Sequence, residues 1–287
     1  MNHDNALHNP ARIRRELLAY AKTCGQDFQR TIDSYAIECL LDRLAHSRYA
    51  ARFVLKGALL YAVWKGPGKR STRDVDLLGR SPYSPEAVLP VFKEVVSAQN
   101  DYDGVLFSPD QIEEHPIKEG DVYEGSRVFV PGALSGARFK VYVDIAFGDA
   151  VTPAPVSAEF PRILNMKPFS LLMYPPESVF AEKLEAIVSR GLINSRMKDY
   201  YDLSFLIRNR LMDTRFVKAA IEKTFQRRKT TLPRVCPPGL SREFAFDRTK
   251  NAQWKAFVER SLLQAEHLPE VVRTIHEYTQ ETIGLKW

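Results

Sequence analysis

Apolar residues recur at helical spacing near both ends of the chain, and this periodicity predicts helices there. Residues 10–23 begin with a proline and carry Leu17, Leu18 and Ala21 on one face. Residues 28–46 continue the pattern, so a second helix follows directly. From about residue 175 the pattern is helical to the end, and it predicts helices over residues 175–190, 197–210, 214–228 and 251–283.

Between these helical parts, shorter alternating runs predict strands at residues 52–57, 73–78, 121–131 and 137–147. Helices are predicted at residues 58–65 and 84–99, and the last two strands are predicted to form a hairpin. This order predicts an α+β fold, in which a mixed sheet with flanking helices precedes a C-terminal helical lobe. The predicted division is N-terminal helices at 1–50, a sheet core at 51–165 and the helical lobe at 166–287.

Composition excludes several classes of protein. A chain of 287 residues with 45% hydrophobic and 26% charged residues is globular rather than disordered. No run of about 18 apolar residues predicts a membrane span, and the N-terminus lacks the apolar segment of a secretory signal. The three scattered cysteines indicate neither zinc nor disulfides, so a reducing cytoplasm is the expected location. The net charge of +6 favours polyanionic partners such as nucleotides or RNA.

Two aspartates on one predicted strand carry the strongest chemical signal. Because side chains alternate along a strand, Asp74 and Asp76 share one face, while Val75 and Leu77 take the core side. Carboxylates about 7 Å apart repel each other unless a positive charge lies between them. Mg²⁺ is the expected cation, with Mn²⁺ as an alternative, because Mg²⁺ binds one or two carboxylates together with substrate phosphates.

A third carboxylate completes the hypothesis of a two-metal site. Asp144 lies on an otherwise apolar strand between Val143 and Ile145, where a charge needs a partner or a metal ion. The hypothesis requires Asp144 to face the other two aspartates, and burial of Asp144 against an arginine would count against it. A solvated strand end is the ordinary explanation of an Asp-x-Asp pair alone.

Neighbouring residues favour the metal site over that ordinary explanation. The Lys56-Gly57 turn can direct backbone N–H groups at phosphate oxygens. Ser71, Thr72 and Arg73 add hydroxyls and positive charge beside the two aspartates. These five residues are the predicted nucleotide-binding residues of this part of the chain.

The sequence resembles the polymerase-β-like nucleotidyltransferase superfamily and, more closely, the AbiEii/AbiGii toxin family, which includes the MenT-type toxins. The matching blocks are residues 53–60 (FVLKGALL), 70–77 (RSTRDVDL), 143–145 (VDI), 181–186 (AEKLEA) and 194–203 (NSRMKDYYDL). The resemblance covers roughly residues 10–210. Ala58 departs from it, because the superfamily often carries serine or glycine there, so a hydroxyl contact to phosphate is missing.

The resemblance implies a fold and an activity. It implies a nucleotidyltransferase-like sheet and transfer of a nucleoside monophosphate from an NTP to a hydroxyl, most simply the 3′ end of tRNA. It also implies a toxin paired with a separately encoded antitoxin. The implied metal ligands are Asp74, Asp76 and Asp144, and Asp144 would also help to deprotonate the acceptor hydroxyl. Two other classes stay open: a nucleotidyltransferase acting on small molecules or proteins, and a non-catalytic nucleotide-binding module.

Two residues of the helical lobe complete the set of candidate site residues. Lys183 lies in mid-helix, where a lysine that extends its charge to solvent is the ordinary explanation. The resemblance instead implies that Lys183 neutralises the triphosphate, and that Asp199 orients Lys183 or shapes the nucleotide pocket. Asp202, three residues after Asp199, is expected to be structural, and both acids could also be ordinary helix N-terminal charges.

Basic residues gather in the helical lobe and could follow an RNA backbone, although a solvated basic helix explains them equally well. They are Arg208, Arg210, Lys218, Lys223, Arg227, Arg228, Lys229 and Arg234. Phe225 beside them could stack on a base, but a core position is the more ordinary one for an aromatic residue. The preferred NTP, the acceptor, the antitoxin and the oligomeric state are not readable from the sequence.

Overall fold

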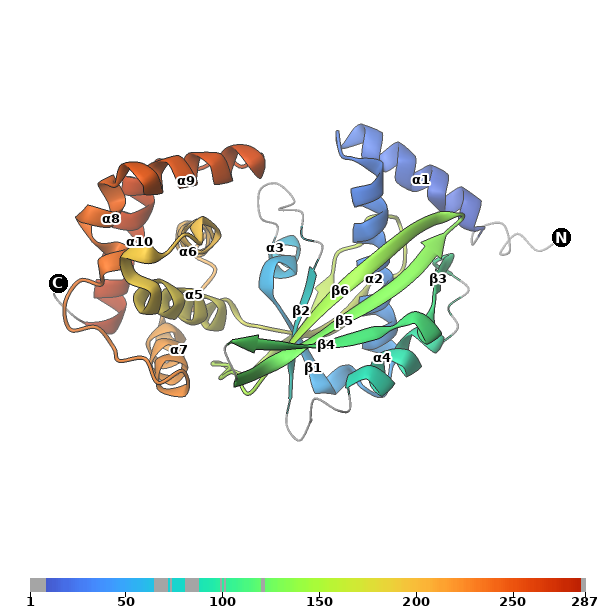
Figure 1. The fold of residues 1–287 in the computed structure, drawn as a ribbon, viewed down its shortest axis with the longest axis horizontal. Coiled ribbons are helices and arrows are strands. Elements are labelled where there is room, and N and C mark those ends of the chain that lie inside the picture. Colours follow the sequence, from blue (N-terminus) through green and yellow to red (C-terminus); the bar gives the residue numbers. More distant parts are fainter. Residues whose placement is uncertain are drawn as a thin grey trace. The chain divides into compact units, whose positions relative to one another are not determined.

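The computed structural model describes residues 9–64, 72, 74–80, 88–98, 100, 102–119 and 122–284, without the side chains of 118, 119 and 122–124 (Figure 1). Contacts within the chain divide it into two compact units. The first unit comprises residues 1–63, 71–148 and 157–173, and the second comprises residues 64–70, 149–156 and 174–287. Each unit is described by itself below.

A mixed sheet forms the centre of the first unit, with the described strands in the order β3-β5-β6-β2-β1-β8-β7 and β4 pairing with β5. The strands are β1 (Phe53–Lys56), β2 (Asp74–Gly79), β3 (Val105–Phe107), β4 (Glu113–Glu119), β5 (Val122–Leu134), β6 (Ala137–Phe147), β7 (Val156–Phe160) and β8 (Phe169–Met173). Strand β2 runs parallel to β6 and antiparallel to β1. The sheet therefore brings β1, β2 and β6 side by side at its centre.

A two-residue turn fixes the register of the long hairpin formed by β5 and β6. Ser135 and Gly136 both have positive φ, 45° and 83°, as a turn that matches the twist of the two strands requires. Leu134 therefore pairs with Ala137, and the ladder continues to Gly125 and Ala146. Register along this hairpin decides which residues stand opposite Asp144.

The sheet of the first unit carries helices α1 (Pro10–Thr23), α2 (Phe28–His46), α3 (Leu60–Val63) and α4 (Val88–Ser97). Asn9 and Asp27 cap α1 and α2 by accepting hydrogen bonds from the first-turn amides of Ala11 and Arg30. Helix α2 packs on β6 and β8, and α1 packs on α2. The core side of the sheet is apolar, since Val75, Val143 and Ile145 are fully buried.

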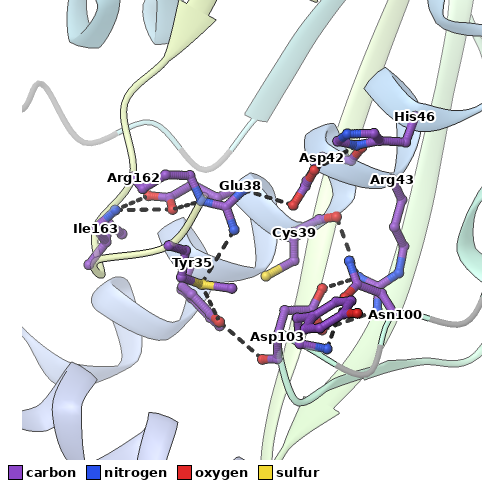
Figure 2. Close-up of polar contacts among 12 residues, drawn as sticks. Tyr35, Glu38, Cys39, Asp42, Arg43, His46, Asn100, Asp103, Arg162 and Ile163 are labelled. Carbon is purple, nitrogen blue, oxygen red and sulfur yellow. Dashed lines mark hydrogen bonds and ion pairs between the residues drawn. The ribbon is translucent and has the colours of Figure 1, made fainter. Parts of the chain in front are cut away.

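A buried polar network anchors α2 to the rest of the first unit (Figure 2). The Arg43 guanidinium lies 2.9 Å from the Asp103 carboxylate, and both side chains are almost fully buried. Arg162 contacts Glu38 and Asp42 in the same way, at 3.5 Å and 2.8 Å. Burial raises the pKa of Asp103, and the charge of Arg43 opposes that rise. Because each buried charge has an opposite charge beside it, this cluster is structural.

The second unit is helical. Its helices are α5 (Pro176–Arg190), α6 (Met197–Arg208), α7 (Thr214–Arg227), α8 (Arg242–Phe246), α9 (Arg248–Arg260) and α10 (Leu268–Ile283). Helix α5 packs on α6 and α7, and α6 also packs on α9 and α10. Tyr200, Phe225 and Phe244 are fully buried among these helices, and the Tyr200 hydroxyl donates to the Gly239 carbonyl at 2.8 Å.

The predicted α+β class is confirmed: the structure has a mixed sheet with flanking helices and a helical C-terminal part. The predicted helix over 251–283 is wrong, because α9 ends at Arg260 and α10 begins at Leu268. Leu262 there has a φ of 51°, which no helix interior allows, and Pro269 lies at the start of α10. Strands β3, β4, β7 and β8 escaped prediction, and residues 84–87 of the predicted helix 84–99 lie outside the described residues.

Among the described residues, no helix is long and apolar enough to span a bilayer.

Candidate functional site

The three candidate aspartates lie on one face of the central strands. Asp76 pairs directly with Asp144 across the parallel β2–β6 ladder, and Asp74 pairs with Tyr142. Paired residues in neighbouring strands point to the same face of a sheet, so the three carboxylates share the face opposite Val75, Val143 and Ile145. All three aspartates are partly exposed, as access by a ligand requires. The condition that Asp144 face the other two is therefore met.

Gly57 lies directly against the side chain of Asp76. Strand β1 ends at Lys56, which pairs with Asp76, and Gly57 follows with a φ of 73°. A Cβ atom at Gly57 would lie 1.9 Å from an Asp76 carboxylate oxygen, closer than any two such atoms can come. Gly57 is thus required twice, for its left-handed backbone and for the space that Asp76 occupies.

Asp144 also has a basic partner. Arg127 pairs with Asp144 across the β5–β6 ladder, and its Nε and one terminal nitrogen each donate to a different carboxylate oxygen at 2.6 Å. This hydrogen-bonded carboxylate raises the pKa of Arg127, and the charges of Asp74 and Asp76 add to the rise. Lys56, Asp76, Asp144 and Arg127 form a cross-strand row with charges +, −, −, +.

The Arg127 partner counts against Asp144 as a ready metal ligand. Both Asp144 oxygens are engaged, and no group of three or more His, Cys, Asp and Glu residues in the described parts of the chain could hold a metal ion. The pair is not buried, however, because the Arg127 side chain is 44% exposed and that of Asp144 is 23% exposed. Asp74 and Asp76 by themselves suit Mg²⁺, which takes one or two carboxylates plus phosphates. Asp144 can join them only by exchanging Arg127 for the cation.

The hydroxyl of Thr72 hydrogen-bonds to the backbone at the start of β2. It accepts from the Asp74 amide at 3.2 Å and lies 3.1 Å from the Asp74 carbonyl oxygen. Thr72 therefore helps to fix the backbone that carries Asp74. Ser71 and Arg73, the other predicted phosphate contacts of this segment, lie outside the described residues.

In the second unit, Lys183 and Asp199 meet as the resemblance implies. The Lys183 ammonium lies 2.9 Å from Asp199 and 2.7 Å from Asp202, and both carboxylates are almost fully buried. Arg196 adds a bond to the other Asp199 oxygen at 2.6 Å. Burial alone would raise the pKa of Asp199, but the charges of Lys183 and Arg196 hold it below its usual value. Asp202 shares Lys183 equally, so the lysine is clamped between two acids.

Acidic residues neutralise part of the positive charge of the basic stretch in the helical lobe. Arg228 bonds Glu185 at 2.9 Å and also contacts Asp149 and Glu182. Although burial alone would lower its pKa, these acids raise the pKa of Arg228 above its ordinary value. Arg208 bonds Glu266, and Phe225 is a core residue with 1% exposure. The expectation of a core position for Phe225 is confirmed, and base stacking on it is excluded.

Sequence reasoning missed Arg127. The signal was present in the two-residue Ser135-Gly136 turn, because such a turn fixes the hairpin register and places Arg127 opposite Asp144. The longer connection predicted between the two strands concealed it.

Comparison with known proteins adds a family to this geometry. The family model described as "Nucleotidyl transferase AbiEii toxin, Type IV TA system" matches residues 39–277, which include Asp74, Asp76, Asp144, Lys183 and Asp199. The chain belongs to the AbiEii family. The resemblance of the sequence blocks to this family is thereby confirmed, although the match begins at residue 39 and extends past the expected end near residue 210. Nucleotidyl transfer within a toxin–antitoxin system is the family's described role.

Two solved structures have a similar fold to this AbiEii-family chain. One is "Crystal structure of JHP933 from Helicobacter pylori", and the other is a "putative nucleotidyltransferase from H. pylori". Each is 16% identical with a TM-score of 0.53 and covers 90% of this chain; the alignment spans 93% and 96% of their own chains. No curated protein matches the chain in sequence. The structural likeness supports the fold assignment.

Proposed function

We propose that this AbiEii-family protein transfers a nucleoside monophosphate from an NTP to the 3′-terminal hydroxyl of tRNA and releases pyrophosphate, with Mg²⁺ or Mn²⁺ as cofactor. The single observation that carries the proposal is the register of Asp74, Asp76 and Asp144 on one partly exposed sheet face beside the Gly57 turn. Such a face is what metal-dependent nucleotidyl transfer needs: carboxylates for the cation and a turn that lets phosphate oxygens approach.

The residues divide the work as follows. Asp74 and Asp76 would hold the cation, which when bound neutralises phosphate charge and lowers the pKa of the attacking hydroxyl. Gly57, which has no Cβ, leaves room for the Asp76 carboxylate, and Lys56, which pairs with Asp76, adds positive charge for phosphate oxygens. Asp144 would accept the proton of the acceptor hydroxyl once Arg127 releases it. Lys183 in the second unit keeps the assignment that the family motif implies, neutralisation of the triphosphate.

The biological side of the proposal rests on the family. A toxin of a Type IV system implies an antitoxin encoded separately, and a modified tRNA 3′ end would block aminoacylation and stop growth. We expect the toxin to act in the cytoplasm, where NTP and tRNA are available.

The test is a transfer assay with each α-³²P-labelled NTP, total RNA and Mg²⁺. We expect label on tRNA-sized RNA with wild type and at least a 100-fold loss with Asp76→Ala, since removal of a metal-binding carboxylate costs about 3 kcal/mol or more. Asp110→Ala is the matched control, because Asp110 is an exposed aspartate of the same unit in the turn between β3 and β4.

Other outcomes select the alternatives. Label found only on small molecules or on protein would replace tRNA as the acceptor. Absence of pyrophosphate release from every NTP, with wild type as inactive as Asp76→Ala, would show a nucleotide-binding module without turnover.

A further inference from the structure

A basic pocket lies within the helical second unit. The loop before α6 and the side of α9 enclose a pocket of about 570 Å³ lined by Ser195, Arg196, Met197, Lys198, Gln253, Ala256, Phe257 and Arg260. Pockets that bind small ligands or ligand segments measure about 300–1,000 Å³. No acidic residue is among the lining residues, while three of them are basic.

The α9 side of the pocket is one continuous helix face. Gln253, Ala256, Phe257 and Arg260 follow the spacing i, i+3, i+4, i+7, which places them in a row. Phe257 packs its edge against Tyr201 of α6 at 6.1 Å and so fixes the distance between the two helices. The pocket therefore has apolar and cationic lining residues on both α9 and the segment that begins α6.

Two of the three cations that line the pocket, Arg196 and Arg260, differ in the partners that they already have. Arg196 is oriented from behind by the buried Asp199 and keeps 41% of its side chain exposed. Arg260 is exposed at the end of α9 and makes no hydrogen bond or ion pair within the described parts of the chain. The buried oxygen of the Gln253 amide also lacks a hydrogen-bond partner there. A ligand that brings negative charge would pair with the exposed Arg260 guanidinium.

We propose that this pocket binds the sugar–phosphate backbone of a single-stranded segment of the acceptor RNA. Arginine matches phosphate with a planar pair of donors, so Arg196 and Arg260 are its phosphate contacts, and Lys198 adds a point charge. The apolar lining residues Met197, Ala256 and Phe257 accept the flat faces of ribose or base. The inference deepens the proposed function, because it depends on RNA being the acceptor.

The site differs from the basic stretch that the sequence suggested. Arg228 and Arg208 of that stretch are held by acids. In the pocket Asp199 holds Arg196 in the same way, but the Arg260 side chain has no acidic partner within the described parts of the chain, and both arginines line one concavity. Phosphate recognition needs convergent donors rather than a count of basic residues.

The test measures RNA binding without catalysis, in the Asp76→Ala background, with no NTP and no Mg²⁺. The probe is a fluorescent single-stranded oligonucleotide ending in CCA, followed by anisotropy across a range of salt concentrations. We expect Arg260→Ala to weaken binding about tenfold, the effect of one charged hydrogen bond. The slope of log affinity against log salt should fall by about 0.7, the value for one contact to a single strand.

Arg248→Ala is the matched control. Arg248 is an exposed arginine of the same helix, twelve positions before Arg260 and so about 120° around the helix from the pocket row. Its removal should leave affinity and slope unchanged. An equal loss in both variants would overturn the proposal, because binding would then report total charge alone.

Two further results separate this proposal from the proposed function. If Arg260→Ala lowers affinity for NTP as much as for RNA, the pocket belongs to the nucleotide and the inference fails while the transferase stands. If wild type labels no RNA and binds the oligonucleotide no better than a basic protein of similar charge, both proposals fail.

Discussion

The pair of Arg127 and Asp144 leads to a test of the metal site that needs no substrate. The Arg127 guanidinium donates to both oxygens of Asp144. Arg127→Met removes this positive charge while keeping a long side chain at the position. In the metal-free protein the change leaves Asp74, Asp76 and Asp144 on one face without this counter-charge. A divalent cation should then replace what was lost.

The magnitude follows from exposure and spacing. A partly exposed bidentate pair contributes about 1 kcal/mol. Carboxylates on neighbouring strands lie about 5 Å apart, where repulsion is about 0.8 kcal/mol in water and about 3 at an effective dielectric of 20. Because Arg127 is 44% exposed, the lower repulsion applies. That repulsion is present with and without Arg127, so the loss on mutation is that of the pair, about 1 kcal/mol. In a domain of about 150–250 residues this lowers Tm by about 2–4 °C.

The assay is thermal unfolding in EDTA and in Mg²⁺ or Mn²⁺. A cation at ten times its dissociation constant stabilises by about 1.4 kcal/mol when nothing must be displaced. We therefore expect a larger cation-induced rise of Tm in Arg127→Met than in wild type, where the cation competes with the arginine. Arg138→Met, an exposed arginine of the same hairpin, should respond like wild type.

The reasoning is refuted if the cation raises Tm equally in wild type and Arg127→Met. It is also refuted if the extra response persists in Arg127→Met combined with Asp144→Asn. In that case Asp144 serves only to hold Arg127, and the metal site consists of Asp74 and Asp76.

Three further predictions follow from single contacts. Gly57→Ala should abolish transfer and destabilise the fold by well over 1 kcal/mol, because the new Cβ collides with Asp76. Gly136 also has a positive φ, but the space around it is open, so Gly136→Ala should cost only about 1 kcal/mol by chemical denaturation and keep transfer activity. Lys183→Met should destabilise the protein by about 3–5 kcal/mol, because Asp202 would lose Lys183 while staying buried and Asp199 would keep only Arg196; denaturation midpoints equal to wild type would contradict this. The pKa of Asp199 is lowered on folding, so its contribution is complete above its unfolded pKa of about 3.9 and is lost as pH falls through the lower folded value; urea unfolding below about pH 4 should therefore show a steeper loss in wild type than in Asp199→Asn.

Local periodicity was enough to find most helices and the hairpin. Residues 10–23 and 28–46 carry their own caps and apolar faces, so their boundaries were readable and agree with α1 and α2. Strands β7 and β8 were not, because each is only five residues long; β7 is largely exposed and not continuously apolar, and β8 pairs with the distant β1. The break between α9 and α10 depends on a single residue with positive φ, Leu262, which periodicity does not reveal.

The arrangement of charged residues at the candidate site could likewise be predicted only where it depends on local sequence. Alternation along one strand placed Asp74 and Asp76 on a common face, and the two-residue turn contained the information for Arg127. Whether Asp144 lies beside Asp76 depends on a parallel β2–β6 ladder joined by more than fifty residues, which no local pattern encodes. The family blocks supplied that long-range information, because they preserve the order in which the fold brings these residues together.

Burial separates the two acidic clusters into different chemical roles. Asp199 and Asp202 are almost inaccessible and share Lys183, so replacing that cation would expose buried charge and cost several kcal/mol. Asp144 and Arg127 are partly exposed, so exchanging the arginine for a divalent ion costs about 1 kcal/mol, which ion binding offsets. The lysine cluster is therefore a fixed part of the second unit, and the exchangeable positive charge lies on the sheet face of the first. Ligand-dependent change should accordingly be found at Arg127 and not at Lys183.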